Sequence, residues 1–295
     1  MINGILNVYK DRGYTSHDVV ARLRGILKQK KIGHTGTLDP DATGVLPVCL
    51  GSGTKLCDMI TDKSKEYEAV MLLGITTDTE DASGKTLSEA EYPLDEELVK
   101  KITMSFIGEY DQIPPMYSAI KINGKKLYEL AREGKTIERK PRQVVINDIK
   151  ITEINLPRVK FTVSCSKGTY IRSLCRDIGE KIGCGACMES LVRTRVGVFE
   201  IEESLTLQKI EALVSQNAIS DAVTPVDKVF SEYPAVTVYE RNRKLVENGN
   251  MFPGAKDKCS NFECVRVYLD EGHTFAGIYR YDSERGFFMP VKMFL

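Results

Sequence analysis

One acidic residue, Asp39, lies in a stretch of sequence suited to holding a side chain in a fixed place. Three glycines and Pro40 surround it within the run Gly33–Val48. Glycine reaches backbone angles that other residues avoid and proline fixes its own, so the run predicts an irregular, tightly specified loop. A carboxylate held in such a loop can act as a nucleophile or accept a proton. The alternative is ordinary turn chemistry, in which Asp39 caps the next segment.

A second carboxylate, Asp41, follows Asp39 after one proline. Paired carboxylates serve glycoside hydrolases, which place them on opposite sides of one glycosidic bond. Residues two positions apart with a proline between them are poorly placed for that arrangement. A hydrolase is therefore disfavoured.

Two other residues are candidates to work with Asp39. Tyr67 lies on one face of an alternating segment, and Arg172 lies in the first turn of a predicted helix. A tyrosine on an alternating face more often belongs to the core, and an arginine one turn from Arg176 is more often a surface charge. Residue type alone leaves both alternatives open.

Hydrophobic spacing predicts the elements that must position these residues. Apolar residues at helical spacing predict helices, and strict alternation predicts strands. The predicted elements are helices over residues 16–30, 94–106 and 171–182 and strands over residues 66–73 and 159–165. Thr15 or Ser16 is expected to cap the first helix.

Charge is balanced overall but segregated along the chain. The net charge is zero and the pI is about 6.8. Lys121–Arg142 and Arg158–Arg195 each contain eight basic and three acidic residues, whereas Asp78–Glu97 contains eight acidic residues and one lysine. Such segregation can present a basic face to a phosphate backbone, although solvated helix faces explain it equally well.

Several separately spaced motifs stand out along the chain, and they are Lys10–Ser16, Gly33–Val48, Lys65–Tyr67, Thr77–Gly84, Gln112–Ala119, Ser166–Leu174 and Leu191–Gly197. They resemble the motifs of the TruB family, the bacterial enzymes that make pseudouridine at position 55 of tRNA. In the first motif, Asp11 stands where the family usually has proline, which concerns loop stiffness rather than chemistry.

The resemblance implies an α/β (α+β) fold in two domains. A catalytic domain over residues 1–232 is expected to have a mixed, mainly antiparallel sheet flanked by helices, with an RNA-binding insertion at about 121–145. Short β segments separated by Gly, Asn and Asp predict a small β domain over residues 233–295. The family usually carries a PUA-like RNA-binding barrel there, and the alternative is a domain that only covers the main sheet.

The resemblance also implies roles for individual residues. Asp39 is the expected catalytic residue, Arg172 is expected to keep it charged, and Tyr67 is expected to stack on the uracil and help remove its C5 proton. His34 is expected to fill the space that the flipped base leaves, the alternative being a capping or core histidine. The other expected substrate-binding residues are Gly36, Thr37, Leu38, Lys65, Asp81, Tyr170, Leu191 and Arg193.

The implied activity is isomerisation of uridine 55 in the T loop of tRNA. It breaks the N1 glycosidic bond and joins C5 to the same sugar carbon, so nothing is oxidised and no cofactor is expected. The expected partner is the T loop and T stem of tRNA, with no obligatory protein partner. Two alternatives stay open: a noncatalytic tRNA-binding or tRNA-folding protein, and a guide-dependent pseudouridine synthase.

The eight cysteines are expected to be reduced. Cys184 and Cys187 have the spacing of a zinc half-site, but Cys259 and Cys264 are more widely spaced than structural zinc sites usually are, so no metal site is expected. Neither a leader pattern nor a run of roughly 18 apolar residues is present, so no membrane association and a cytoplasmic location are expected.

Overall fold

The computed structural model describes residues 1–122, 124–255, 259, 263–269 and 274–295. The other residues fall in the predicted insertion and the predicted C-terminal β domain, and those parts of both predictions lie outside the described residues. The helices are α1 (Ser16–Leu27), α2 (Cys57–Thr61), α3 (Glu96–Met104), α4 (Leu127–Arg132), α5 (Ile171–Ile182), α6 (Leu207–Ser215) and α7 (Arg243–Glu247).

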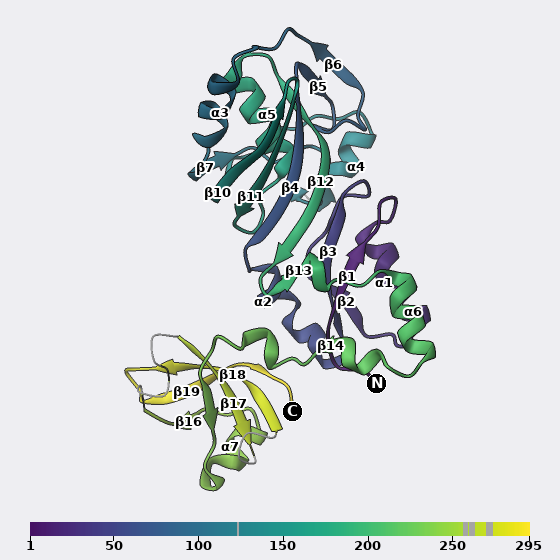
Figure 1. Cartoon of the computed structure of the whole chain (residues 1–295). Coiled ribbons are helices and arrows are strands. Elements are labelled where there is room, and N and C mark those ends of the chain that lie inside the picture. The colour runs from purple at the N-terminus through teal and green to yellow at the C-terminus, as the bar shows by residue number, and fades with distance from the viewer. Residues whose placement is uncertain (123, 256–258, 260–262, 270–273) are drawn as a thin grey trace.

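A mixed, ten-stranded sheet forms the frame of the molecule (Figure 1). In spatial order its main path is β14 (Val223–Thr224), β1 (Gly4–Lys10), β3 (Thr43–Leu50), β12 (Ala186–Val196), β4 (Lys65–Leu73), β11 (Arg158–Cys165), β10 (Arg142–Asn155) and β7 (Gly108–Gln112). Two more strands join it at the side, β2 (Ile32–His34) on β3 and β13 (Phe199–Glu200) on β12. Neighbours are antiparallel except β3 and β12, which are parallel. The predicted fold class is thus confirmed.

Two short hairpins lie outside this sheet. One pairs β5 (Ile75–Thr77) with β6 (Thr86–Glu89), and the other pairs β8 (Lys121–Ile122) with β9 (Lys125–Lys126). The second hairpin leads into α4, where the sequence predicts an insertion.

Capping residues fix the ends of the helices near Asp39 and Arg172. Thr15 caps α1, its side chain accepting from the Asp18 N–H while the Asp18 carboxylate accepts from the Thr15 N–H. Lys28 adopts a left-handed conformation and ends α1 at Leu27, short of the predicted residue 30. Gly183 ends α5 in the same way, at φ +98°. No helix in the described part of the chain has the length and apolar character to cross a membrane.

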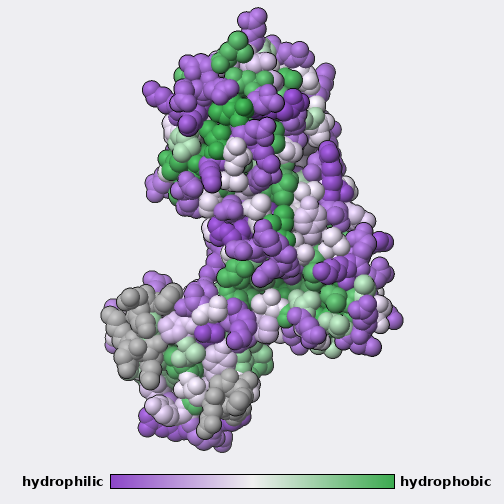
Figure 2. Space-filling model, in the orientation of Figure 1, coloured by the Kyte–Doolittle hydropathy of each residue, from purple (hydrophilic) through white to green (hydrophobic). Residues whose placement is uncertain are grey.

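Helices cover different parts of the sheet. α5 contacts β12 and α3, while α1 and α6 contact each other beside β1 and β2. Figure 1 shows the two helix pairs at separate levels of the molecule. In Figure 2, hydrophobic residues gather on this face over the region of α3 and α5, and hydrophilic residues cover most of the rest.

A second, five-stranded sheet forms near the C-terminus. Its order is β15 (Ala235–Thr237), β17 (Cys264–Leu269), β18 (Thr274–Asp282), β19 (Phe287–Met293) and β16 (Phe252–Pro253). It has its own buried core, yet Ile278 of β18 belongs to the same buried cluster as Val45 of β3 and Phe230. The Lys55 ammonium donates to the Met293 carbonyl at 2.8 Å. Apolar packing therefore joins the two sheets, and a hydrogen bond joins the C-terminal sheet to the segment that follows β3.

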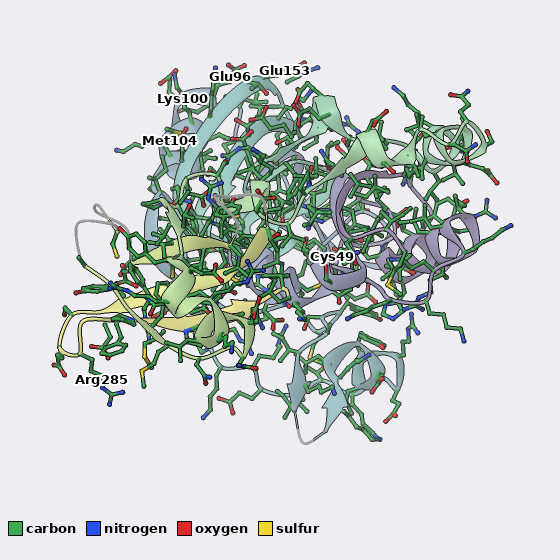
Figure 3. The ribbon with its side chains drawn as sticks, turned by 90° about the horizontal axis from the view of Figure 1, so that it is seen from below. Cys49, Glu96, Lys100, Met104, Glu153 and Arg285 are labelled. Carbon is green, nitrogen blue, oxygen red and sulfur yellow. The ribbon has the colours of Figure 1, made fainter. Side chains whose placement is uncertain are left out.

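The run Gly33–Val48 is less irregular than the sequence predicts. Its first residues belong to β2 and its last belong to β3, so the irregular part spans residues 35–42. Val45 and Cys49 pack on one side of β3, and Leu46 and Val48 pack in another core cluster. Figure 3 shows Cys49 inside the molecule, whereas Glu96 and Lys100 of α3 lie at its rim. A strand buried on both faces lacks the alternation that identifies strands in a sequence.

Candidate functional site

The loop that carries Asp39 is fixed by hydrogen bonds from neighbouring elements. The Leu38 N–H donates to the Ser16 hydroxyl at 2.9 Å, at the start of α1. The Gly13 N–H donates to the Pro40 carbonyl at 2.9 Å, and the Thr35 N–H donates to the Pro47 carbonyl at 3.2 Å. Asp39 therefore stands between anchored neighbours, as the glycines and prolines predict.

Arg172 of α5 forms a two-point ion pair with Asp39. Its Nε lies 3.0 Å from Oδ2 and its Nη2 lies 3.2 Å from Oδ1. The guanidinium also donates to the Thr79 carbonyl at 3.1 Å and to the Tyr117 carbonyl at 3.0 Å. Arg172 is 5% exposed, so its position is set by these three segments. A bidentate pair of this kind fixes the direction of the carboxylate as well as its place.

Two opposing effects act on the Asp39 carboxylate. Burial raises its pKa above the ordinary value of 3.8, while Arg172 and Lys10 oppose that shift and Asp81 adds to it. Arg172 thus acts in the expected direction, but burial outweighs it. The side chain keeps 38% of its surface exposed, which leaves the carboxylate open to a reacting group.

Asp81 stands beside this pair, on the connection between β5 and β6. Its Oδ1 accepts from the Thr79 hydroxyl at 2.8 Å and from the Ser83 hydroxyl at 2.6 Å. Its Oδ2 lies 3.8 Å from Arg172 Nη1. The structure thus brings Asp81 to the same arginine as Asp39.

The apolar side of the site is shared by three predicted residues. Tyr67 of β4, Leu191 of β12 and Leu38 belong to one buried core cluster. Burial raises the pKa of the Tyr67 hydroxyl, and Arg193 partly opposes the shift. Tyr67 is therefore a neutral phenol at neutral pH.

Arg193 of β12 binds the loop from behind. Its Nε donates to the Val45 carbonyl at 2.7 Å and its Nη2 donates to the Gly36 carbonyl at 3.5 Å. The residue is 1% exposed. Gly44 passes so close that an added Cβ would lie 2.2 Å from the Arg193 carbonyl oxygen. In this structure the guanidinium of Arg193 supports the loop backbone.

His34 and Thr37 flank the start of the loop, and they differ in burial: His34 is half-buried, whereas Thr37 is exposed. His34 ends β2, its Nδ1 accepts from the Gly36 N–H at 3.3 Å, and its ring lies 5.8 Å from that of His17. Burial, His17 and Arg193 lower the pKa of His34, which keeps the imidazole neutral at pH 7.

Lys65 and Tyr170 hold neighbouring segments. The Lys65 ammonium donates to the carbonyls of Thr61 and Lys63, the second at 2.6 Å, and burial lowers its pKa to about 8. Tyr170 precedes α5, and its backbone exchanges hydrogen bonds with the Gln112 amide at 2.8 and 3.0 Å. Contact of either residue with a substrate stays a prediction.

Lys10 is a buried cation at the site that the sequence did not assign. It is 0% exposed, and its ammonium donates to the carbonyls of Asp11 and Pro40, both at 3.1 Å. Burial lowers its pKa to about 8, although the negative charge of Asp39 opposes the shift. The available signal was its position at the start of the motif Lys10–Ser16.

In the described part of the chain the cysteines are not joined by disulfides. Among the residues that the structure describes, no group of three or more His, Cys, Asp or Glu could hold a metal ion. His273, the histidine nearest the second cysteine pair in sequence, lies outside the described residues.

Two family models together match residues 24–231 of the chain. A family model for "TruB family pseudouridylate synthase (N terminal domain)" matches residues 24–171, and one for "tRNA pseudouridylate synthase B C-terminal domain" matches residues 172–231.

Relatives that match over almost the whole chain are named "tRNA pseudouridine synthase B". The chain is 53% identical to the protein of Lachnoclostridium phytofermentans, over 100% of both chains. It is 40% identical to that of Bacillus subtilis, over 100% of this chain and 98% of the other. A solved structure, "Crystal Structure of a Cbf5-Nop10-Gar1 Complex", contains a similar chain with a TM-score of 0.76 and 28% identity, covering 99% of this chain and 85% of that one.

Proposed function

Since this chain belongs to the TruB family of pseudouridylate synthases, we propose that it converts uridine 55 in the T loop of tRNA to pseudouridine, in the cytoplasm. Members of this family are isomerases. The relatives named for a tRNA synthase are 40% to 53% identical over almost their whole length, which supports tRNA as the substrate.

The bidentate pair of Asp39 and Arg172 carries the proposal. The reaction breaks the N1 glycosidic bond, turns the uracil and joins C5 to the same sugar carbon. An ionised carboxylate is needed to attack the sugar or the base, or to take a sugar proton, and Asp39 has that role here. Arg172 aims the carboxylate and stabilises its charge. No oxidation occurs, so the reaction uses no cofactor.

Tyr67 and Leu191 form the apolar wall of the uracil site. The Tyr67 ring stacks on the base, and its phenol assists removal of the C5 proton after rotation. Unstacking the base costs about a few kcal/mol, which contacts with the RNA must offset. His34 fills the vacated space in the T loop, and its neutral imidazole enters a base stack without burying a charge.

The other assigned residues shape the substrate site around this wall. The backbone of the loop approaches the nucleotide. Asp81 holds Arg172 beside Asp39, and Arg193 holds the loop backbone. Lys65 and Tyr170 line the outer edge of the substrate site. The residues are Gly36, Thr37, Leu38, Lys65, Asp81, Tyr170 and Arg193.

Two regions outside the site bind the rest of the RNA in this proposal. The catalytic domain spans residues 1–232, and its basic insertion at about 121–145 contacts the T loop. Residues 233–295 form a PUA-like domain that contacts the adjoining stem. No guide RNA or protein partner is required, which separates this chain from a guide-dependent enzyme. The solved chain from the Cbf5 complex is similar in fold at only 28% identity.

Release of tritium from tRNA that carries 5-tritiated uridine tests the proposal. The purified wild-type chain is expected to release tritium, while Asp39→Asn lowers the rate at least about a thousandfold at equal RNA occupancy. Asp41→Asn is the matched control, because Asp41 pairs with Arg12 at the surface at 3.1 Å. Binding without release by the wild type would favour a noncatalytic tRNA-binding protein, and release that needs added guide RNA would favour the guide-dependent alternative.

A further inference from the structure

A buried carboxylate that has no role in the reaction lies behind the site. Glu80 is 8% exposed and adopts a left-handed backbone conformation at φ +65°, which a residue with a side chain rarely does. Its Oε2 accepts from the Ser173 hydroxyl at 2.6 Å, and its Oε1 accepts from Arg176. Both partners lie on α5. A conformation of this kind persists where surrounding contacts hold it.

Arg176 repeats, one helical turn later, the contacts of Arg172. Arg172 donates to the carbonyls of Thr79 and Tyr117. Arg176 donates to the Glu80 carboxylate, one residue beyond Thr79, and to the Ile113 carbonyl at 3.1 Å. Each arginine therefore joins α5 to the same two segments, the turn after β5 and the chain that follows β7.

These contacts determine where the guanidinium of Arg172 can lie. The Thr79 carbonyl keeps its place only while the turn at Glu80 stays against α5. The Glu80 backbone is fixed on its other side, where its carbonyl accepts from the Met188 N–H at 3.0 Å. Loss of one partner leaves a buried charge without compensation, so the pair resists opening.

We propose that Glu80 and Arg176 are positioning residues, which hold Arg172 in the orientation that aims the Asp39 carboxylate. This inference rests on the proposed function, since it takes Asp39 as the reacting group. Glu80 and Arg176 touch neither the substrate nor Asp39. They act through the carbonyls that Arg172 binds.

The charged groups around these residues define the expected pH effect. Asp39 faces Arg172 of α5, Asp81 of the β5–β6 connection and Lys10 of β1. Arg176 faces Glu80, Asp177 at 2.7 Å and Glu180 at 3.8 Å. When Arg172 loosens, the attraction that lowers the pKa of Asp39 weakens. The pKa then rises, and the acid limb of the pH–rate profile moves to higher pH.

The test is the pH dependence of single-turnover tritium release from 5-tritiated tRNA. Glu80→Gln keeps the shape of the side chain and removes its charge. It is expected to move the acid limb upward by about 0.5–1 unit and to lower the rate at pH 7 about tenfold. The dissociation constant for tRNA should stay within about twofold of wild type, since no RNA contact is removed.

Asp177→Asn is the matched control. Asp177 binds the same arginine but lies on the same helix, so it cannot hold the turn. Its acid limb should coincide with that of the wild type. Ser173→Ala is a second variant that keeps both charges, and it should shift the limb in the direction of Glu80→Gln by a smaller amount.

The outcomes separate this inference from the proposed function. An active wild type whose acid limb is unchanged in both Glu80→Gln and Ser173→Ala would overturn the positioning role. An equal shift in Asp177→Asn would also overturn it. Such a shift would show that any charge paired with Arg176 has this effect, whether or not it joins α5 to the turn at Glu80. A wild-type chain that releases no tritium contradicts the proposed function itself.

Discussion

The Asp39 carboxylate is held in a position that costs the fold stability. Burial raises its pKa above 3.8, so the folded chain binds its proton more tightly than the unfolded chain does. Stability contributed by this group is therefore greatest at low pH and falls as pH rises through the folded pKa. Arg172 offsets part of this loss of stability and fixes the orientation of the Asp39 carboxylate. An ionised Asp39 therefore lowers the stability of the fold.

Asp39→Asn should therefore be slightly more stable than the wild type at pH 7. The neutral amide resembles the protonated carboxyl, which the fold prefers. We expect a gain in Tm of roughly 1–3 °C, small because the side chain is partly exposed. The gain should shrink as pH approaches 4, measured by thermal unfolding. Asp41→Asn should show no such trend, and a lower Tm for Asp39→Asn at pH 7 would contradict this account.

At this scale the sequence predicts single residues better than pairs. The density of glycine and proline around Asp39 predicts an irregular loop that holds this residue, and the structure shows one over residues 35–42, while the ends of the run belong to β2 and β3. Nothing in the spacing joins Asp39 to Arg172, because their meeting depends on how two distant segments fold. The resemblance supplied that pair. The burial of Lys10 and the backbone contacts of Arg193 depend on three-dimensional packing. The sequences of Lys10–Ser16 and Leu191–Gly197 do not indicate either of them.

At the scale of elements, the site depends on a close approach of two strands. β3 leads away from the Asp39 loop, and β12 carries both Leu191 and Arg193. The strands meet where Gly44 pairs with Arg193. Gly44 has φ +104° and no room for a side chain. A larger residue there must push the strands apart.

Gly44→Ala should destabilise the chain by about 2–4 kcal/mol, because it adds both backbone strain and a clash with the Arg193 backbone. Urea unfolding measures the loss. Gly13→Ala separates the two causes, since Gly13 has φ +87° but nothing within 4 Å of the added Cβ. It should cost about 1 kcal/mol. Equal losses in the two variants would show that the clash has no effect.

The sequence predicts best the elements that bury one face and expose the other. β4 alternates buried and half-buried residues along its length, and α5 buries the residues expected at helical spacing. α3 forms where predicted, but it buries Val99 and Thr103 while Leu98 is 39% exposed. β3 is buried on both faces, so its pattern contains no period. Local spacing therefore predicts an element without fixing its neighbours.

At the scale of the whole molecule, the two sheets share a hydrophobic cluster. Ile278 of the C-terminal sheet lies in the same buried cluster as Val45, Leu56 and Phe230. Val45 is also the residue whose carbonyl binds Arg193. Packing of the C-terminal sheet is thus continuous with the support of the loop that carries Asp39.

Ile278→Ala should lower the free energy of unfolding by about 2–4 kcal/mol, because it opens a cavity in this cluster. Hydrogen exchange should show the C-terminal sheet opening more often than the main sheet. Val291→Ala is the control, since Val291 is 44% exposed on the neighbouring strand. It should stay within about 0.5 kcal/mol of wild type. Equal hydrogen-exchange protection of the two sheets in Ile278→Ala would contradict the expectation that the C-terminal sheet opens more often.

The seam between β3 and β12 also determines how the main sheet bends. Two residue pairs join these strands, whereas nine join β4 to β12. A short ladder offers little resistance to bending, so elastic deformation of the sheet concentrates at this seam. The loop with Asp39 ends where the seam begins, at Thr43. Between β1 and β7 this is the shortest ladder of the main sheet, so that part of the sheet bends most easily beside the loop that carries Asp39, and a long, stiff ligand that loads both of its ends would bend it there first.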